Sequence, residues 1–229
     1  MVISHAEDMT ISKYDYRLAE NIETARNILL CEYYGANLHM AHVSTKESIA
    51  YIQNAKENGV NVTCEVTPHH LYFYDNPYKV NPPIREKADV TALIKAIKKG
   101  YIDCISTDHA PHTTQDKQKG AAGMVGLETA FGAVYKVLVA ENGIPLAKLS
   151  AMLSDNPSKL LGLNKGKIKV GYDGDIVLAD VDKKWTVDSQ CFASRSNNTA
   201  FEGETLQGKI MLTVKNGKIT FKDENFALK

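Results

Sequence analysis

Hydrophobic and polar positions follow a repeating pattern over the first 161 residues of the chain. Short apolar runs, which are typical of buried strands, cover residues 1–5, 38–42, 60–67 and 102–107. Segments with apolar residues at helical spacing follow at residues 18–34, 44–59, 88–99 and 127–141, and a shorter helical pair ends at Leu161. Strands that alternate with helices through short links form right-handed parallel crossovers. This part of the sequence therefore predicts an α/β domain with a parallel sheet.

Two of the expected helices carry recognisable end signals. The helix at 18–34 should end at Gly35, a residue suited to a left-handed C-terminal cap. Its buried stripe is expected to consist of Ile22, Ala25 and Leu29. The helix at 44–59 begins with Ser44 and Glu47 at the spacing of a capping box. Its buried positions are expected to be Ile49, Ile52 and Ala55.

After Gly162 the hydrophobic period changes to alternation, which predicts strands. The expected strands are Lys167–Val170, Asp175–Ala179, Lys209–Val214 and Lys218–Phe221. They should form two hairpins, and the Asn216-Gly217 pair favours a type I′ turn in the second. The polar stretch Ser189–Glu204 is expected to be a loop. We predict two domains, an α/β domain at residues 1–161 and a small antiparallel β module at residues 162–229.

Composition and charge narrow the classes of function. The chain has 229 residues, of which 44% are hydrophobic, so it can bury a sizeable core. The 27 basic and 27 acidic residues give a formal net charge of zero, and nothing favours binding to nucleic acid or to a membrane. The four cysteines lie far apart, and no targeting segment is expected at the start of the chain. We expect a cytoplasmic protein with reduced thiols that acts on a small molecule.

Three polar side chains stand where predicted strands end. His5 and His42 close the first two apolar runs, and Asp108 follows the fourth. The carboxyl ends of the strands carry the catalytic groups in an α/β barrel, and imidazole and carboxylate groups are ligands of catalytic Zn²⁺. The sequence therefore predicts a zinc site at this end of the sheet, made by His5, His42 and Asp108.

Seven short segments together resemble a known family. In chain order they are His5–Asp8, His42–Ser48, Glu65–Leu71, Asn81–Arg85, Asp108–His112, Gly126–Thr129 and Asn198–Gly203. The chain resembles the second half of a dihydroorotase, a metal-dependent cyclic-amide hydrolase of the amidohydrolase superfamily that acts in pyrimidine biosynthesis. The resemblance implies the second half of a TIM-type (β/α)8 barrel, followed by the antiparallel β module at residues 162–229, which would be part of a β-sandwich.

The resemblance also implies roles for individual residues. His5 and His42 would be ligands of the second of two zinc ions. Asp108 would bind the first ion, and would act as general base toward the attacking water and then as general acid toward the departing amide nitrogen. The implied substrate-binding residues are Asn81, His112, Val125 and Gly126. Among these, His112 would contact the substrate carboxylate, and residues 113–123 would form a mobile loop over the site.

Part of the family's site is absent from this sequence. Complete relatives begin with a first-strand H-x-H-x-R segment and carry a bridging carboxylate, and neither is found here. An eight-stranded barrel takes about 250 residues, whereas only four strand–helix units are counted here. We therefore expect the chain alone to be inactive and to hold at most one Zn²⁺, weakly. It should associate with the absent N-terminal half or with further copies of itself, and an aspartate transcarbamoylase is another candidate partner.

Two other functions stay open. A related cyclic amidase, such as an allantoinase or a dihydropyrimidinase, would share the barrel and the metal ligands. A non-catalytic dihydroorotase-like subunit would instead bind a transcarbamoylase. Asn81 before two prolines and His112 at the end of its motif favour dihydroorotase over the other amidases.

Other polar residues near the predicted strand ends have weaker signals. His39 has the opposite parity to His42 and is expected to face the helices. Three further histidines, expected to be structural, are His69, His70 and His109. A supporting role for His69 or His70 is the alternative. The acidic residues that could orient a ligand histidine are Glu7, Asp8 and Glu65.

Overall fold

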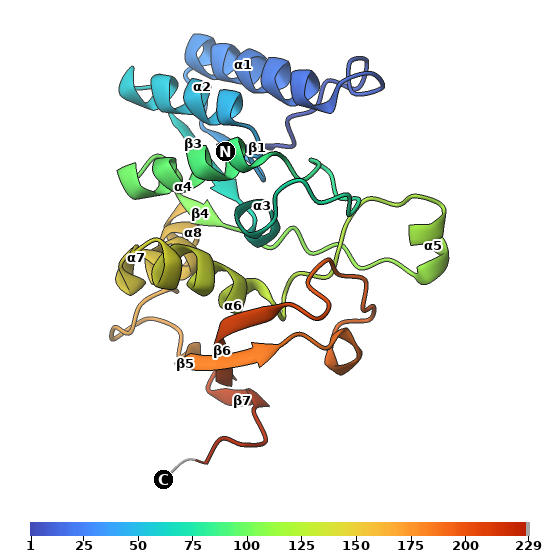
Figure 1. Ribbon diagram of the computed structural model, residues 1–229. Helices are drawn as coiled ribbons and strands as arrows, with labels where there is room; N and C mark the ends of the chain where they lie inside the picture. The colour runs from blue at the N-terminus through green and yellow to red at the C-terminus, as the bar shows by residue number, and fades with distance from the viewer. Residues whose placement is uncertain (228–229) are drawn as a thin grey trace. The chain divides into compact units, whose positions relative to one another are not determined.

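The computed structural model describes residues 1–227 of the chain (Figure 1). The chain divides into two compact units. The first unit holds Met1–Gly126 together with Ser194–Ala200, and the second holds Leu127–Ala193 and the described residues from Phe201 onward. The predicted boundary after residue 161 rests on a change of hydrophobic period and not on packing, and it stays a prediction.

The sheet of the first unit is parallel, as the sequence predicts, and its strands follow chain order. The strands are β1 (Val2–Ser4), β2 (Leu38–Met40), β3 (Val62–Val66) and β4 (Cys104–Ile105). In the register of the sheet, Ile3 lies beside His39, and His39 lies beside Thr63. Because all four strands run in one direction, the loops that carry the predicted site residues leave the sheet at the same end.

The first unit has helices between its strands and one further helix after the last strand. They are α1 (Tyr16–Tyr34), α2 (Lys46–Glu57), α3 (Pro68–Tyr72), α4 (Lys87–Lys99) and α5 (Thr114–Gln118). The three long helices confirm the predicted crossovers, and Gly35 caps α1 with a φ of 61°, in the left-handed region. The short helices α3 and α5 were not predicted, because five residues are too few to show a helical period.

The buried face of α1 differs from the predicted stripe. Ile22 and Leu29 are 38% and 64% exposed. The buried residues of the helix are Ala19, Glu20, Thr24, Ile28 and Cys31. Two of these are polar and have partners in the first unit, since Glu20 pairs with Arg85 at 3.1 Å and the Thr24 hydroxyl donates to Ser48. Buried polar groups with partners are stable inside a protein, so hydrophobicity alone selected the wrong face.

The start of α2 also corrects the prediction. Ile49, Ile52 and Ala55 are buried as expected. The N-cap, however, is Thr45, whose hydroxyl accepts from the backbone N–H of Ser48. Ser44 lies outside the helix, where its hydroxyl and its backbone N–H both donate to Glu20. The predicted capping box with Ser44 as cap is therefore wrong, because the buried carboxylate of α1 competes for that hydroxyl.

Asp89 of α4 forms hydrogen bonds to residues of α1 and α2. Its side chain is 1% exposed and accepts hydrogen bonds from the Arg17 guanidinium at 2.6 and 3.0 Å and from the Lys46 backbone N–H at 2.9 Å. Burial alone would raise the pKa of Asp89, but the hydrogen bonds from Arg17 and Lys46 outweigh it and hold the pKa well below its usual value. This carboxylate should therefore stabilise the fold while it is ionised.

We expect Asp89→Asn to lower the free energy of unfolding by about 2 kcal/mol at pH 7, because the substitution leaves Arg17 without its most buried partner. A group with a depressed folded-state pKa contributes its stability above its unfolded pKa of about 3.9 and loses it as the pH falls toward the folded value. Urea unfolding at pH 7 and at pH 3 measures both effects. Arg26→Gln, which removes an exposed pair on α1, should change stability by less than about 0.5 kcal/mol, and an equal loss in both variants would contradict the assignment.

The second unit combines a helical part with an antiparallel sheet. Its helices are α6 (Ala130–Val134), the π-helix η1 (Tyr135–Glu141), α7 (Leu146–Ser150), the π-helix η2 (Ala151–Asp155) and α8 (Asn156–Leu160). They confirm the helix predicted at 127–141 and the helical pair that ends at Leu161. The expected loop at 189–204 contains no strand and a single 3₁₀ turn, η3 (Ser189–Cys191).

The three strands of this sheet are β5 (Ile176–Thr186), β6 (Thr205–Lys215) and β7 (Lys218–Lys222), in the order β5-β6-β7. Asn216 and Gly217 join β6 to β7 with φ of 50° and 72°, as a type I′ turn requires. The strand predicted at Lys167–Val170 is wrong. Ile168 and Val170 are 92% and 99% exposed, and β5 pairs with β6 instead, because alternation does not specify a pairing partner.

The part of the chain that the structure describes contains no helix with the length and apolar character that crossing a membrane requires.

Candidate active site

His5 and His42 lie side by side where β1 and β2 end. His5 Nδ1 is 2.8 Å from His42 Nε2, and the two rings meet edge to face with centroids 4.7 Å apart. Ser4 and Met40, the last residues of the two strands, are register partners, so the adjacent strand ends deliver the two imidazoles to one place. The structure thus brings together two of the three predicted metal ligands.

The charge state of His42 suits a metal. Burial, and then the neighbouring His5, lower the pKa of His42, so its imidazole is neutral at pH 7. The neutral imidazole is the form that binds Zn²⁺. His42 Nδ1 is buried and has no hydrogen-bond partner, while Nε2 faces His5. Two imidazole nitrogens that converge in this way fit part of a zinc site.

Asp108 follows β4 at the same end of the sheet. Burial raises its pKa to about 6, the charge of His5 opposes this shift, and the charge of Glu65 adds to it. A carboxyl group with a pKa near neutrality is suited to exchange protons. Among residues 1–227, however, no three His, Cys, Asp or Glu side chains form a group that could hold a metal. The structure therefore does not join Asp108 to the histidine pair as a third ligand.

Two of the three predicted metal ligands have an unusual backbone conformation. His42 and Asp108 have φ of 35° and 46°, in the left-handed region that residues other than glycine rarely adopt. Within the described residues only Asp75 and Asn216 share this feature, and Asn216 belongs to the hairpin turn. Strained positions of this kind often lie at functional sites.

Glu7 connects the histidine pair to a predicted substrate-binding residue. Its Oε2 atom accepts hydrogen bonds from His5 Nε2 and from Asn81 Nδ2, both at 2.8 Å. Burial alone would raise the pKa of Glu7, but the hydrogen bonds from His5 and Asn81 outweigh it and lower the pKa. Glu7 is therefore an ionised acceptor. Its carboxylate bridges the side chains of His5 and Asn81.

His112 and the loop that follows it are held by Asn198. The backbone N–H of His112 donates to Asn198 Oδ1 at 2.9 Å, and Asn198 Nδ2 donates to the Gly123 carbonyl at 3.1 Å. The His112 ring donates from Nε2 to the carbonyl of Ala122 at 2.8 Å. Asn198 therefore fixes both ends of the segment 113–123, which contains α5. The sequence contained Asn198 in a recognised motif but gave it no role, because its partners lie far away along the chain.

The Val125 and Gly126 backbone is buried and already engaged. The Val125 N–H donates to the carbonyl of Asn198 at 2.7 Å, and the Gly126 N–H donates to His109 Nδ1 at 3.3 Å. A Cβ atom on Gly126 would lie 2.9 Å from the carbonyl oxygen of Thr107, so only glycine fits at this approach. The bond from Gly126 is consistent with the structural role expected for His109.

His39 corrects a further prediction. Ser4 accepts a hydrogen bond from Asn27 of α1, so the Ser4 side of the sheet faces the helices. His39 belongs to the alternate row of residues, and its ring contacts Thr63 at 2.8 Å and Glu65 at 3.2 Å. It therefore lies on the sheet face turned away from α1. The prediction compared the parity of His39 with that of His42 as if both lay in the strand. His42 follows the end of β2, so its position does not show which face of the sheet His39 occupies.

The other histidines and acidic residues lie as follows. His70 accepts from the Thr67 hydroxyl and donates to the Pro82 carbonyl, and burial lowers its pKa to about 4, which fits a structural role. His69 is also buried, and its Nε2 has no partner.

Asp8 accepts from Thr10 and not from a histidine. Glu7 contacts the predicted ligand His5, whereas Glu65 contacts His39, so only Glu7 of the three candidates bonds to a predicted ligand histidine.

Comparison with known proteins places the chain in a family. Residues 5–220 match the Amidohydrolase family. The chain belongs to the amidohydrolase family. This confirms the resemblance that the seven motifs indicate. Among curated relatives of this amidohydrolase, a dihydroorotase from Clostridium botulinum is 53% identical over 224 residues, which cover 97% of this chain and 56% of the relative. A dihydroorotase from Caldicellulosiruptor saccharolyticus is 39% identical over 249 residues, covering 97% of this chain and 58% of that relative.

Solved structures of hydantoinases share the fold. An L-hydantoinase (dihydropyrimidinase) from Arthrobacter aurescens has a TM-score of 0.90 at 27% identity, and the match covers 99% of this chain and 58% of that chain. A D-hydantoinase (dihydropyrimidinase) from Thermus sp. has a TM-score of 0.86 at 26% identity over 93% of this chain and 50% of that chain. The chain spans little more than half the length of the relatives it matches.

Proposed function

We propose that the chain is the C-terminal portion of a dihydroorotase, which reversibly hydrolyses the cyclic amide of dihydroorotate to N-carbamoyl-aspartate in pyrimidine biosynthesis. The observation that carries the proposal is the contact of His5 Nδ1 with His42 Nε2 at the ends of two parallel strands. It occurs in an amidohydrolase chain that is 53% identical to a dihydroorotase. The protein would act on this small molecule in the cytoplasm.

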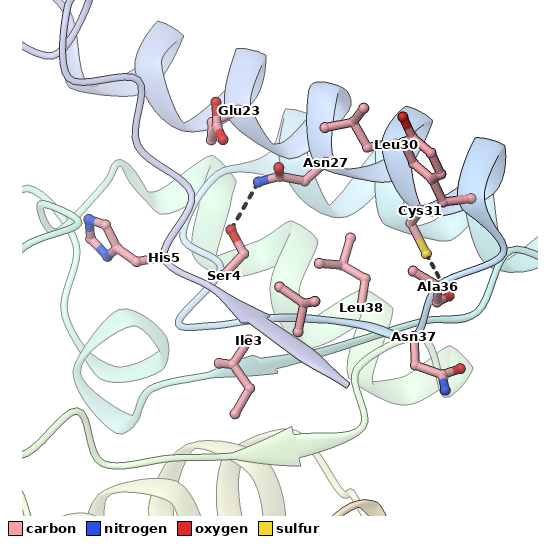
Figure 2. A pocket seen from close by; sticks show the side chains of 12 residues that line it. Ile3, Ser4, His5, Glu23, Asn27, Leu30, Cys31, Ala36, Asn37 and Leu38 are labelled. Carbon is pink, nitrogen blue, oxygen red and sulfur yellow. Dashed lines mark hydrogen bonds between the residues drawn. The ribbon is translucent and has the colours of Figure 1, made fainter.

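The parallel sheet would be the second half of a TIM-type (β/α)8 barrel, and the antiparallel sheet part of a β-sandwich module. An open strand edge supports this reading. β1 pairs only with β2 among the described strands, and Val2 and Ile3 are 60% and 61% exposed. A cavity of about 440 Å³ runs along β1 and α1, with Ile3 and Leu30 in its lining (Figure 2). A strand and helix from the N-terminal half would cover this edge.

We expect the isolated chain to associate, because an unpaired parallel edge with exposed apolar side chains favours pairing with other chains. Light scattering over a wide concentration range should detect a dimer or larger species, and adding the N-terminal half should reduce the self-association. A stable monomer at all concentrations would contradict the half-barrel assignment.

Within the complete site, His5 and His42 would hold the second of two zinc ions, and Asp108 would bind the first. When bound, the metal pair would polarise the amide carbonyl and make water a stronger nucleophile. Asp108 would accept a proton from the attacking water and return it to the ring nitrogen as the C–N bond breaks. The pKa of about 6 that burial gives Asp108 is compatible with both transfers.

Substrate would be held by residues of the first unit. His112 would contact the carboxylate, and Asn81 the ring. Because the N–H groups of Val125 and Gly126 are bonded within the protein, their contacts to the ring would be made by carbonyl oxygens.

We expect His112→Ala to raise KM for dihydroorotate about 10-fold or more while kcat changes less, because its partner is the carboxylate and not the amide that is cleaved. Steady-state kinetics should be measured on this chain fused to the segment of the Clostridium botulinum relative that it does not match. Thr114→Ala, in the adjoining α5, is a matched control. A loss confined to kcat would contradict the role of His112.

A related cyclic amidase is the second candidate, because the solved structures with the same fold include hydantoinases. The identity to these is 27% and 26%, against 53% to a dihydroorotase, which favours dihydroorotate as substrate. The same fusion tests the choice. Hydrolysis of dihydroorotate in preference to hydantoin supports the proposal, and the reverse preference favours the alternative. A fusion that retains zinc but acts on neither substrate would support a non-catalytic subunit, whose partner would be a transcarbamoylase.

A further inference from the structure

Glu7 contacts two residues of the site, His5 and Asn81. It follows His5 by two residues, and its side chain is only 10% exposed. Asn81 reaches the same carboxylate from the segment between α3 and α4. One oxygen atom, Oε2, accepts both hydrogen bonds at 2.8 Å, so neither donor can turn without weakening its contact.

The contact with Glu7 also decides which nitrogen of His5 carries the proton. An ionised carboxylate only accepts hydrogen bonds, so His5 Nε2 must be the donor. In the neutral ring this leaves Nδ1 as a lone pair, and Nδ1 is the atom directed at His42. Carboxylates that accept from the second nitrogen of a ligand histidine fix its tautomer and its orientation.

We propose that Glu7 is a positioning residue that sets His5 and Asn81 together, so that the metal-ligand nitrogen of His5 and the substrate-facing amide of Asn81 share one anchor. This inference rests on the proposed function for the roles of His5 and Asn81. It adds a coupling between them, because a change at the carboxylate would disturb both.

The first test uses the chain itself and needs no activity. Nitrogen-15 NMR of the histidine side chains should show His5 protonated at Nε2 in the wild-type chain. In Glu7→Ala the ring should become a mixture of tautomers, and Zn²⁺ affinity, measured by titration with the metal alone, should fall about 10–100-fold. Glu7→Gln keeps the side-chain volume and should lie between the two. Asp8→Asn is the matched control, since Asp8 bonds to Thr10 and should leave both readouts unchanged.

The second test measures the coupling in the fusion with the N-terminal segment of the Clostridium botulinum relative. Glu7→Ala and Asn81→Ala should each raise KM for dihydroorotate, and the double variant should show less than the product of the two effects. Independent effects would overturn the coupling.

The outcomes separate this inference from the proposed function. An unchanged His5 tautomer in both Glu7 variants would overturn the positioning role, even if the fusion hydrolyses dihydroorotate. A shifted tautomer with hydantoin as the preferred substrate would support the positioning role and reject dihydroorotase as the function.

Discussion

Asp108→Asn, in this chain fused to the N-terminal segment of the Clostridium botulinum dihydroorotase, is expected to lower kcat by a factor on the order of 10²–10⁴. A positioned acid–base group contributes this much to rate, and the loss is larger if the metal is disturbed as well. Asparagine keeps the size of the side chain but cannot take a proton from water or return it to the amide nitrogen. Steady-state kinetics in both directions of the reaction measure the effect, since one group would serve both.

Asp103→Asn is the control for Asp108→Asn. Asp103 lies just before β4, and its carboxylate pairs with Lys56 at 2.6 Å and accepts from the Cys64 backbone. Its loss should affect stability more than turnover. If Asp108→Asn retains more than about a tenth of wild-type kcat, the proton-transfer role is wrong.

The second large effect concerns metal. His42→Ala should abolish measurable Zn²⁺ binding by the isolated chain, which we expect to hold at most one ion, weakly. At this site two imidazoles converge, and no third His, Cys, Asp or Glu of the described residues joins them, so removal of either leaves a single ligand. Metal analysis after dialysis and a Zn²⁺ titration should both report the loss, by a factor on the order of 100 or more.

His39→Asn provides the matched control for His42→Ala, because His39 lies three residues earlier and contacts Thr63 and Glu65. It should bind Zn²⁺ as the wild-type chain does. Two tightly held zinc ions in the wild-type chain alone would contradict the view that part of the site lies outside this sequence.

The parallel sheet and its long helices could be predicted because their signals are local. The segments before His5, His42 and Asp108 are short and largely apolar, as expected of strands covered by helices, and glycine at the end of α1 supplied a clear boundary. The hairpin at Asn216-Gly217 was likewise fixed by the backbone angles that its turn requires.

The features that the sequence did not reveal depend on partners distant in the chain. Glu20 is a charged residue on a buried helix face, and only Arg85 and the start of α2 explain it. Asn198 clamps a loop that begins at His112, far earlier in the chain. β5 pairs with β6 and not with residues 167–170. Packing across the sheet decides this pairing, and the alternation of apolar and polar residues does not encode it.

The adjacency of two candidate site residues was predictable, whereas the contacts that connect them to other residues were not. The adjacency of His5 and His42 follows from their strand ends and agrees with the structure. The link from His5 through Glu7 to Asn81 joins two loops, and no spacing in the sequence indicates it.

The most direct test of the account is hydrolysis of dihydroorotate with added Zn²⁺, by this chain alone and by this chain together with the N-terminal segment of the Clostridium botulinum relative. We predict no hydrolysis by the chain alone and robust hydrolysis when the N-terminal segment is present. Robust hydrolysis by the chain alone would contradict the proposed division of the active site.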